Sequence, residues 1–170
     1  MALSGRHLAR AGACMAALVL APAAAQAAAS VTADSTAQVL EEIQFAVLLD
    51  MDFGKIAVRD NALGGVVTID PASGSRNCNA NLVCTGSFAV SRLQLTGSDA
   101  NVQVNFDPTF TLSGPGDPIQ AVPQFPGGPG AVVRLTGGST VVKFGAAITI
   151  NPGQAPGKYS GTFTVNLEYN

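Results

Sequence analysis

Apolar and polar residues alternate along the end of the chain. In residues 159–169 every second position is apolar, aromatic or glycine, and the positions between them are polar. Successive side chains of a β-strand point to opposite faces of a sheet, so this alternation predicts a strand with one buried face. Burial of its large side chains would contribute about 6 to 12 kcal/mol before chain entropy is subtracted, which predicts a structured chain end. The buried face would carry Tyr159, Gly161, Phe163, Val165, Leu167 and Tyr169.

The rest of the chain from residue 39 onward has the same character. Short runs rich in Val, Ile, Thr and Phe alternate with clusters of Gly, Pro, Asn and Asp, and no stretch keeps the period of a helix. Antiparallel strands with one apolar face need a second sheet to cover it, so about eight or nine such strands predict an all-β antiparallel sandwich. The further strands are predicted at residues 65–69, 87–96, 101–106, 109–113, 131–135 and 140–150.

Residues 38–49 fit either a strand or a helix. The apolar residues at odd positions between 39 and 49 would share one strand face, whereas Leu-Glu-Glu at 40–42 tolerates a helix. We favour a strand, because residues 52–56 follow at once and look like the start of the next one.

Residues 114–130 are rich in proline and glycine. Proline lacks the amide hydrogen that a central strand donates to its neighbour, so we expect a long surface loop here. Ile119, Val122 and Phe125 keep this segment from being wholly polar. We favour a loop packed on the edge of the sandwich, with a contact loop as the alternative.

The start of the chain has the features of a secretory signal peptide. Arg6, His7 and Arg10 form a basic beginning, residues 11–21 are apolar, and Ala-Gln-Ala at 25–27 is a small-x-small cleavage site. The apolar run is too short for a membrane span, and no later segment offers the roughly 20 apolar residues that a span needs. We expect residues 1–27 to be removed and residues 28–170 to form a single exported domain, in the periplasm, at the cell surface or outside the cell.

Two of the three cysteines lie in the mature chain. Cys78 and Cys84 are separated by five residues, and in an oxidising compartment we predict that they form one disulfide. Closing so short a loop stabilises the fold by about 2 kcal/mol, which fixes a local turn. A redox-active pair is the alternative, but it usually has Cys-x-x-Cys spacing at the start of a helix.

Charge and the missing histidine exclude several functions. Removal of Arg6 and Arg10 leaves seven Lys or Arg against eleven Asp or Glu, a formal charge of −4, which argues against nucleic acid as a partner. The only histidine, His7, lies in the expected signal peptide, so the mature chain has no imidazole for Ser/His or Cys/His catalysis or for a typical zinc site. We expect no cofactor, no metal site, no catalytic residues and no enzymatic activity.

A pair of carboxylates of the glycosidase type is the least implausible enzymatic reading. Most of the aspartates stand beside Gly, Asn or Pro, where Asp commonly bonds the backbone of a turn. The candidates are Asp50, Asp52, Asp60, Asp70, Asp99, Asp107 and Asp117.

Several motifs occur in an order that resembles a known family. They are Met-Asp-Phe-Gly-Lys-Ile at 51–56, Gly-Val-Val-Thr-Ile at 65–69, Phe-Gly at 144–145 and Gly-Lys-Tyr-Ser-Gly-Thr-Phe-Thr-Val at 157–165. Together they resemble the small secreted bacterial proteins grouped as domain of unknown function 4402, over nearly all of the mature chain. The end of the chain also resembles the last strand of chaperone-usher pilus subunits, with Tyr169 penultimate and Gly157 fourteen positions from the end.

That family is similar to pilin-like and spore coat protein U-like subunits, which implies an immunoglobulin-like sandwich that assembles by strand donation. A pilus subunit lacks its last strand, a periplasmic chaperone fills the groove, and the N-terminal extension of a neighbouring subunit later replaces the chaperone. The resemblance implies that Phe163, Val165, Leu167 and Tyr169 pair with the chaperone and that chaperone cations anchor the carboxylate of Asn170. The implied partners are other copies or related subunits, a periplasmic chaperone and an outer-membrane usher.

The donor implied by the resemblance is the mature N-terminal arm, residues 30–39. Its alternating positions are mostly small, whereas donor strands present larger apolar side chains, so the alternative is an arm that completes its own domain. We therefore expect a non-catalytic secreted structural or surface-assembly subunit of the fimbrial type. The alternative function is a self-contained secreted binding module for surface polysaccharide or a protein ligand.

Overall fold

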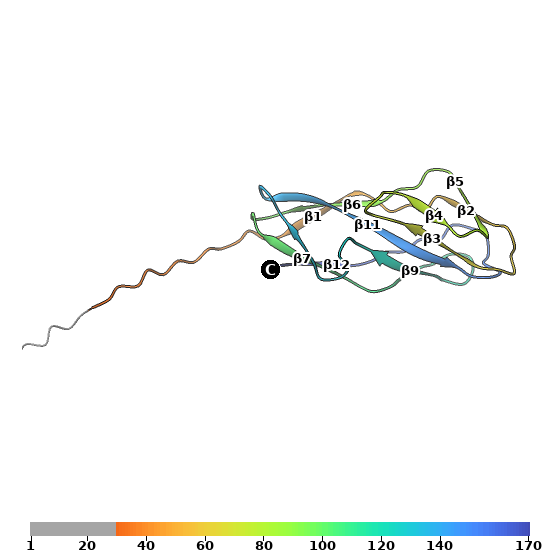
Figure 1. Cartoon of the computed structure of the whole chain (residues 1–170). Coiled ribbons are helices and arrows are strands. Elements are labelled where there is room, and N and C mark those ends of the chain that lie inside the picture. Colours follow the sequence, from red (N-terminus) through yellow and green to blue (C-terminus); the bar gives the residue numbers. More distant parts are fainter. Residues whose placement is uncertain (1–29) are drawn as a thin grey trace, which may run out of the picture. The chain divides into compact units, whose positions relative to one another are not determined.

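The computed structural model describes residues 30–170, so the expected signal peptide lies outside the described residues. Residues 30–37 are exposed and have no regular secondary structure. Residues 38–170 form one compact unit made of antiparallel strands (Figure 1). The strands are β1 (Gln44–Leu49), β2 (Lys55–Val58), β3 (Gly65–Ile69), β4 (Arg76–Cys78), β5 (Leu82–Thr85), β6 (Ser91–Thr96), β7 (Asn101–Phe106), β8 (Phe110–Leu112), β9 (Ile119–Gln124), β10 (Ala131–Arg134), β11 (Ser139–Ile150) and β12 (Val165–Tyr169).

The strands form three sheets. The largest has the order β1-β6-β11-β3-β4, with β9 also beside β11 and β8 beside β9; the second has the order β10-β7-β12, and the third pairs β2 with β5. The twelve-residue β11 joins the two halves of the largest sheet, because its first half pairs with β6 and its second half pairs with β3 and β9. The all-β antiparallel sandwich predicted from the alternating pattern is therefore confirmed.

One half of the core lies between β6 and β11 on one side and the β10-β7-β12 sheet on the other. Leu93, Leu95 and Phe144 from the larger sheet pack in one buried cluster with Val104 and Phe106 from β7. The ring of Phe144 contacts the rings of Phe106, Phe125 and Phe163, with centroids 4.7 to 5.5 Å apart. These alternating inward residues explain why the strand pattern was readable in the sequence.

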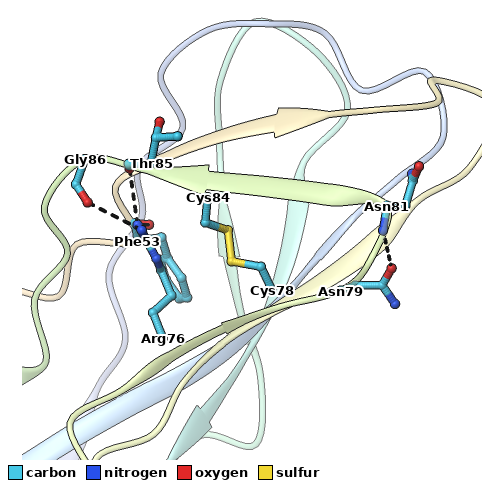
Figure 2. Close-up of a disulfide and its surroundings, with 8 residues drawn as sticks. All are labelled: Phe53, Arg76, Cys78, Asn79, Asn81, Cys84, Thr85 and Gly86. Carbon is cyan, nitrogen blue, oxygen red and sulfur yellow. Dashed lines mark hydrogen bonds between the residues drawn. A yellow bond between two sulfur atoms is a disulfide. The ribbon is translucent and has the colours of Figure 1, made fainter.

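The other half of the core lies under the β2-β5 pair, and the disulfide holds that pair in place. Cys78 in β4 is bonded to Cys84 in β5, as predicted (Figure 2). Because β4 belongs to the largest sheet and β5 to the smallest, the bond joins two sheets and does more than fix a local turn. The Arg76 guanidinium adds a second connection, since Nη1 donates to the carbonyl oxygens of Phe53 (2.7 Å) and Thr85 (3.4 Å).

The prediction that residues 114–130 form a surface loop is wrong. Within this segment β9 pairs with β11 on one side and β8 on the other. Pro123 is tolerated in β9 because the pairing of β9 with β8 ends at Ala121. Pro123 therefore has a neighbouring strand, β11, on one side only.

The number and bounds of some strands also differ from the prediction. The unit has twelve strands where eight or nine were expected, because the short β4 and β5 around the disulfide and β9 were missed. The first strand begins at Gln44 instead of residue 38. The last begins at Val165 instead of residue 159, because Tyr159 turns toward another loop, where its hydroxyl accepts from Gly116 N (3.0 Å) and donates to Ala155 O (2.8 Å).

Candidate functional site

The last strand, β12, has a neighbour on one side only. It pairs with β7, and no strand of the described chain lies along its other edge. The amide of Asn170 donates to Asn101 O at 3.0 Å, and hydrogen-bonded pairs alternate along an antiparallel ladder. The register therefore turns the backbone groups of Val165, Leu167 and Tyr169 toward the open edge.

The first strand, β1, carries apolar side chains that remain more than half exposed on the core side of the sheet. Phe45 lies opposite Leu95 and Val47 lies opposite Leu93. Directly opposed residues share a face, and both leucines are buried, so Phe45 and Val47 belong to the core side of the sheet. Their side chains are nevertheless 61% and 56% exposed, because the β10-β7-β12 sheet stops at β12.

An open groove of about 530 Å³ separates β12 from the segment that leads into β1. Its lining residues are Leu40, Glu41, Glu42, Ile43, Leu167, Glu168 and Tyr169. The groove thus combines unpaired backbone groups on β12 with apolar side chains on both walls. This is what an added β-strand requires, since its backbone needs hydrogen-bonding partners and its alternate side chains need apolar contacts.

The hydroxyl of Tyr169 ties the two walls together at one end. It donates to Glu41 O (2.7 Å) and accepts from Ser98 N (2.8 Å). Glu41 N in turn donates to Ser98 Oγ (2.8 Å). Residues from Glu41 onward are therefore held within the unit.

The structure brings together five of the six residues singled out at the end of the chain. Phe163, Val165 and Leu167 are half-buried and pack against the cluster around Phe144, while Tyr169 and Asn170 form the bonds described above. Gly157 lies apart, with φ of 151°, where an added Cβ would lie 2.5 Å from Cγ of Pro115. Its place beside the 114–116 loop separates it from the open edge of β12.

Sequence reasoning missed the contribution of β1 to this site. The strand was predicted, but Phe45 and Val47 were assigned to an ordinary buried face, because their pattern is the same whether or not a second layer covers them. The local alternation of side chains holds no signal that separates the two cases.

Three of the aspartates singled out in the sequence bond the backbone of turns. No cluster of three or more His, Cys, Asp or Glu that could hold a metal ion occurs in this part of the chain. Asp52, Asp60 and Asp70 each accept from the backbone amide two residues ahead, as expected for turn residues. The hydroxyl of Ser73, followed by the Ala72 amide, holds the pKa of Asp70 below its ordinary value of 3.8.

Two observations bear on the compartment in which the protein resides. The disulfide indicates an oxidising compartment. Among residues 30–170 no helix is long and apolar enough to cross a membrane.

Comparison with known proteins gives one match. The family model described as Domain of unknown function (DUF4402) matches residues 43–169. The match begins just before β1 and ends with the last residue of β12. No curated protein and no solved structure matches significantly.

Proposed function

The chain belongs to the Domain of unknown function (DUF4402) family, and we propose that it is a non-catalytic exported subunit that assembles by accepting a β-strand beside β12. The observation that carries the proposal is the conjunction of an unpaired β12 edge with the uncovered core side of β1. The sandwich would then be of the immunoglobulin-like, pilin-like type that lacks one strand, and the groove would be its strand-acceptor site.

The energetics favour an occupant. Phe45 and Val47 alone leave more than half of each side chain in water, and burial of such a side chain contributes about 1.5 to 3 kcal/mol. An added strand would also pair the backbone groups of Val165, Leu167 and Tyr169, which a free edge exposes to unwanted pairing. A chaperone strand before assembly and a subunit strand after assembly both meet these needs.

The donor is a segment of another copy or of a related subunit. Because Glu41 and β1 are bound within the unit, the part of the N-terminal arm that is free to act as a donor is limited to about residues 30–40. Its alternating side chains are small, so we expect a weak interaction between identical copies and a stronger one with a related subunit whose arm is more apolar.

The test is the oligomeric state and thermal stability of the chain from residue 28 to 170, with and without a peptide of residues 28–40. A peptide that binds only the folded state raises the free energy of unfolding, by about 2.7 kcal/mol when its concentration is a hundred times Kd, and the unfolding temperature rises with it. Self-assembly, or stabilisation by the peptide or by the arm of a related subunit, supports the proposal. A stable monomer that no such strand stabilises contradicts it.

A variant pair makes this test specific to the groove. Phe45→Lys places a charge on the uncovered side of β1, where the side chain is already 61% exposed, so the monomer should remain folded while strand addition is lost. Val132→Lys changes a side chain that is 48% exposed in β10, at the edge of the β10-β7-β12 sheet opposite to β12, and should leave strand addition intact.

A further inference from the structure

We propose that the outer face of β1, β6 and β11 holds a binding site for a sugar ring that bears a carboxylate. This face is opposite to the core side of the sheet, so the inference goes beyond strand acceptance and does not depend on it. The site is built from one row of residues across the three strands and one aromatic wall beside them.

The row places two cations side by side. Lys143 in β11 lies directly opposite Arg92 in β6, and both alternate with buried neighbours, so both point outward. Like charges directly opposite on neighbouring strands are destabilising unless an anion lies between them. The one ion pair among residues 30–170 joins Arg134 to Asp99, so neither Arg92 nor Lys143 has a carboxylate partner there.

A bulge in β1 adds an apolar residue to the same row. The pairing with β6 shifts between Val47 and Leu49, which sets Leu49 opposite Arg92 on the outer face. Leu49 is 44% exposed and therefore remains open to a ligand. The row thus consists of the apolar Leu49 in β1, the cation Arg92 in β6 and the cation Lys143 in β11.

The aromatic wall is Phe88, in the segment before β6. The Arg76 guanidinium lies over its ring at 4.9 Å from the centroid and is itself fixed by the carbonyl of Phe53. The next residue, Ala89, is fixed by a reciprocal pair of backbone bonds with Asp52. One side of the ring is thus supported while the side chain stays 36% exposed, so the wall is formed before a ligand arrives.

Together these residues line a hollow of about 250 Å³, with Leu49, Phe88, Val90, Arg92 and Lys143 among its walls. Its volume lies just below the usual range for drug-sized ligands, roughly 300 to 1,000 Å³, and suits a single ring. A guanidinium binds a carboxylate through two parallel hydrogen bonds, and an apolar wall covers the hydrogen-bearing face of a sugar ring. Both requirements are met by a uronic acid residue of an acidic polysaccharide, and a small inorganic anion would leave the wall unused.

The test is titration of the chain from residue 28 to 170 with galacturonate oligomers, followed by amide NMR shifts and by affinity. We expect shifts at residues 88–92 and 143, and an affinity that falls with added salt. Arg92→Gln and Lys143→Gln should each weaken binding by roughly tenfold, which corresponds to loss of one charge-assisted contact. Lys158→Gln, which removes an exposed cation outside this row, should leave the affinity unchanged.

Further arms separate this ligand from other anions. Neutral galactose oligomers, inorganic phosphate and a polyglutamate peptide should bind at least about tenfold more weakly than galacturonate. Equal binding of the peptide or of phosphate, or unchanged affinity in Phe88→Leu, would overturn the assignment. So would an absence of shifts at about 10 mM oligomer. The unfolding temperature of Arg92→Gln and Lys143→Gln should stay level or rise, since each removes one of two opposed cations.

Discussion

Tyr169→Phe removes a single hydroxyl and with it the hydrogen bond between β12 and the segment that precedes β1. In the wild-type chain this hydroxyl donates to Glu41 O at 2.7 Å and accepts from Ser98 N at 2.8 Å. The ring and its packing remain in the variant, so the change isolates the two hydrogen bonds. After the substitution, one bond still holds the segment before β1, from Glu41 N to Ser98 Oγ in the turn between β6 and β7.

The expected loss follows from the number and exposure of these bonds. A hydrogen bond contributes about 0.5 to 1.5 kcal/mol net, and the bond to Glu41 is exposed, so the two together should contribute about 1 to 2 kcal/mol to the free energy of unfolding. For a domain of this size that corresponds to a fall of about 3 to 8 °C in the unfolding temperature. Most of the effect should be local, in residues 38–43.

Urea unfolding together with amide hydrogen exchange measures both parts of this prediction. The amides of Glu41 and Ser98 should exchange faster, whereas Asn170, bonded to Asn101, should change little. Tyr159→Phe is the matched control, because its hydroxyl makes comparable bonds to the 114–116 loop and to Ala155. That variant should lose stability without loosening Glu41. A Tyr169→Phe protein with a free energy of unfolding within about 0.3 kcal/mol of wild type and unchanged exchange at Glu41 would refute the reasoning.

Three further predictions concern the rest of the unit. Gly145→Ala should destabilise by about 1 to 3 kcal/mol in thermal unfolding, because an added Cβ would meet the backbone of β3; a neutral result would mean that β3 moves aside freely. Replacing Cys78 and Cys84 by serine should cost about 2 kcal/mol or more in urea unfolding and loosen the β2-β5 pair first in hydrogen exchange, whereas uniform loosening would contradict its role as a link between sheets. The pKa of Asp70 is lowered in the folded state, so its contribution to stability is complete above 3.8 and is lost as the pH falls through the lower folded value. In Asp70→Asn the free energy of unfolding should therefore fall less steeply as the pH is lowered through this range. An Asp70 carboxyl that titrates at its ordinary pKa of 3.8 in NMR would argue against this.

The sequence was sufficient where local pattern and tertiary environment agree. The bounds of β3 and β7 match the predicted 65–69 and 101–106, because their alternating side chains are either fully buried or facing out. The disulfide followed from spacing and compartment alone. At β9 the proline-rich sequence led to the wrong prediction of a loop. Pro123 costs a ladder hydrogen bond only where strands lie on both sides of it, and that depends on how far β8 pairs with β9.

The strands of the candidate site could be predicted from the sequence, but the exposure of Phe45 in it could not, for a related reason. The apolar face of β12 could be predicted from residues 163–169, and so could the strand character of β1. Whether Phe45 is covered depends on the order of strands in the other sheet, which ends at β12. Sheet order is set by contacts between distant parts of the chain and leaves no mark on the local alternation of side chains.

The position of β12 also bears on when the chain can fold. Phe163, Val165 and Leu167 pack against the same cluster as Phe144, and Tyr169 holds a residue 128 positions earlier. The core on that side therefore cannot close until synthesis has passed Tyr169. A nascent chain remains open along this side until β12 has been made, so the synthesis of β12 is the step that makes this part of the native core possible.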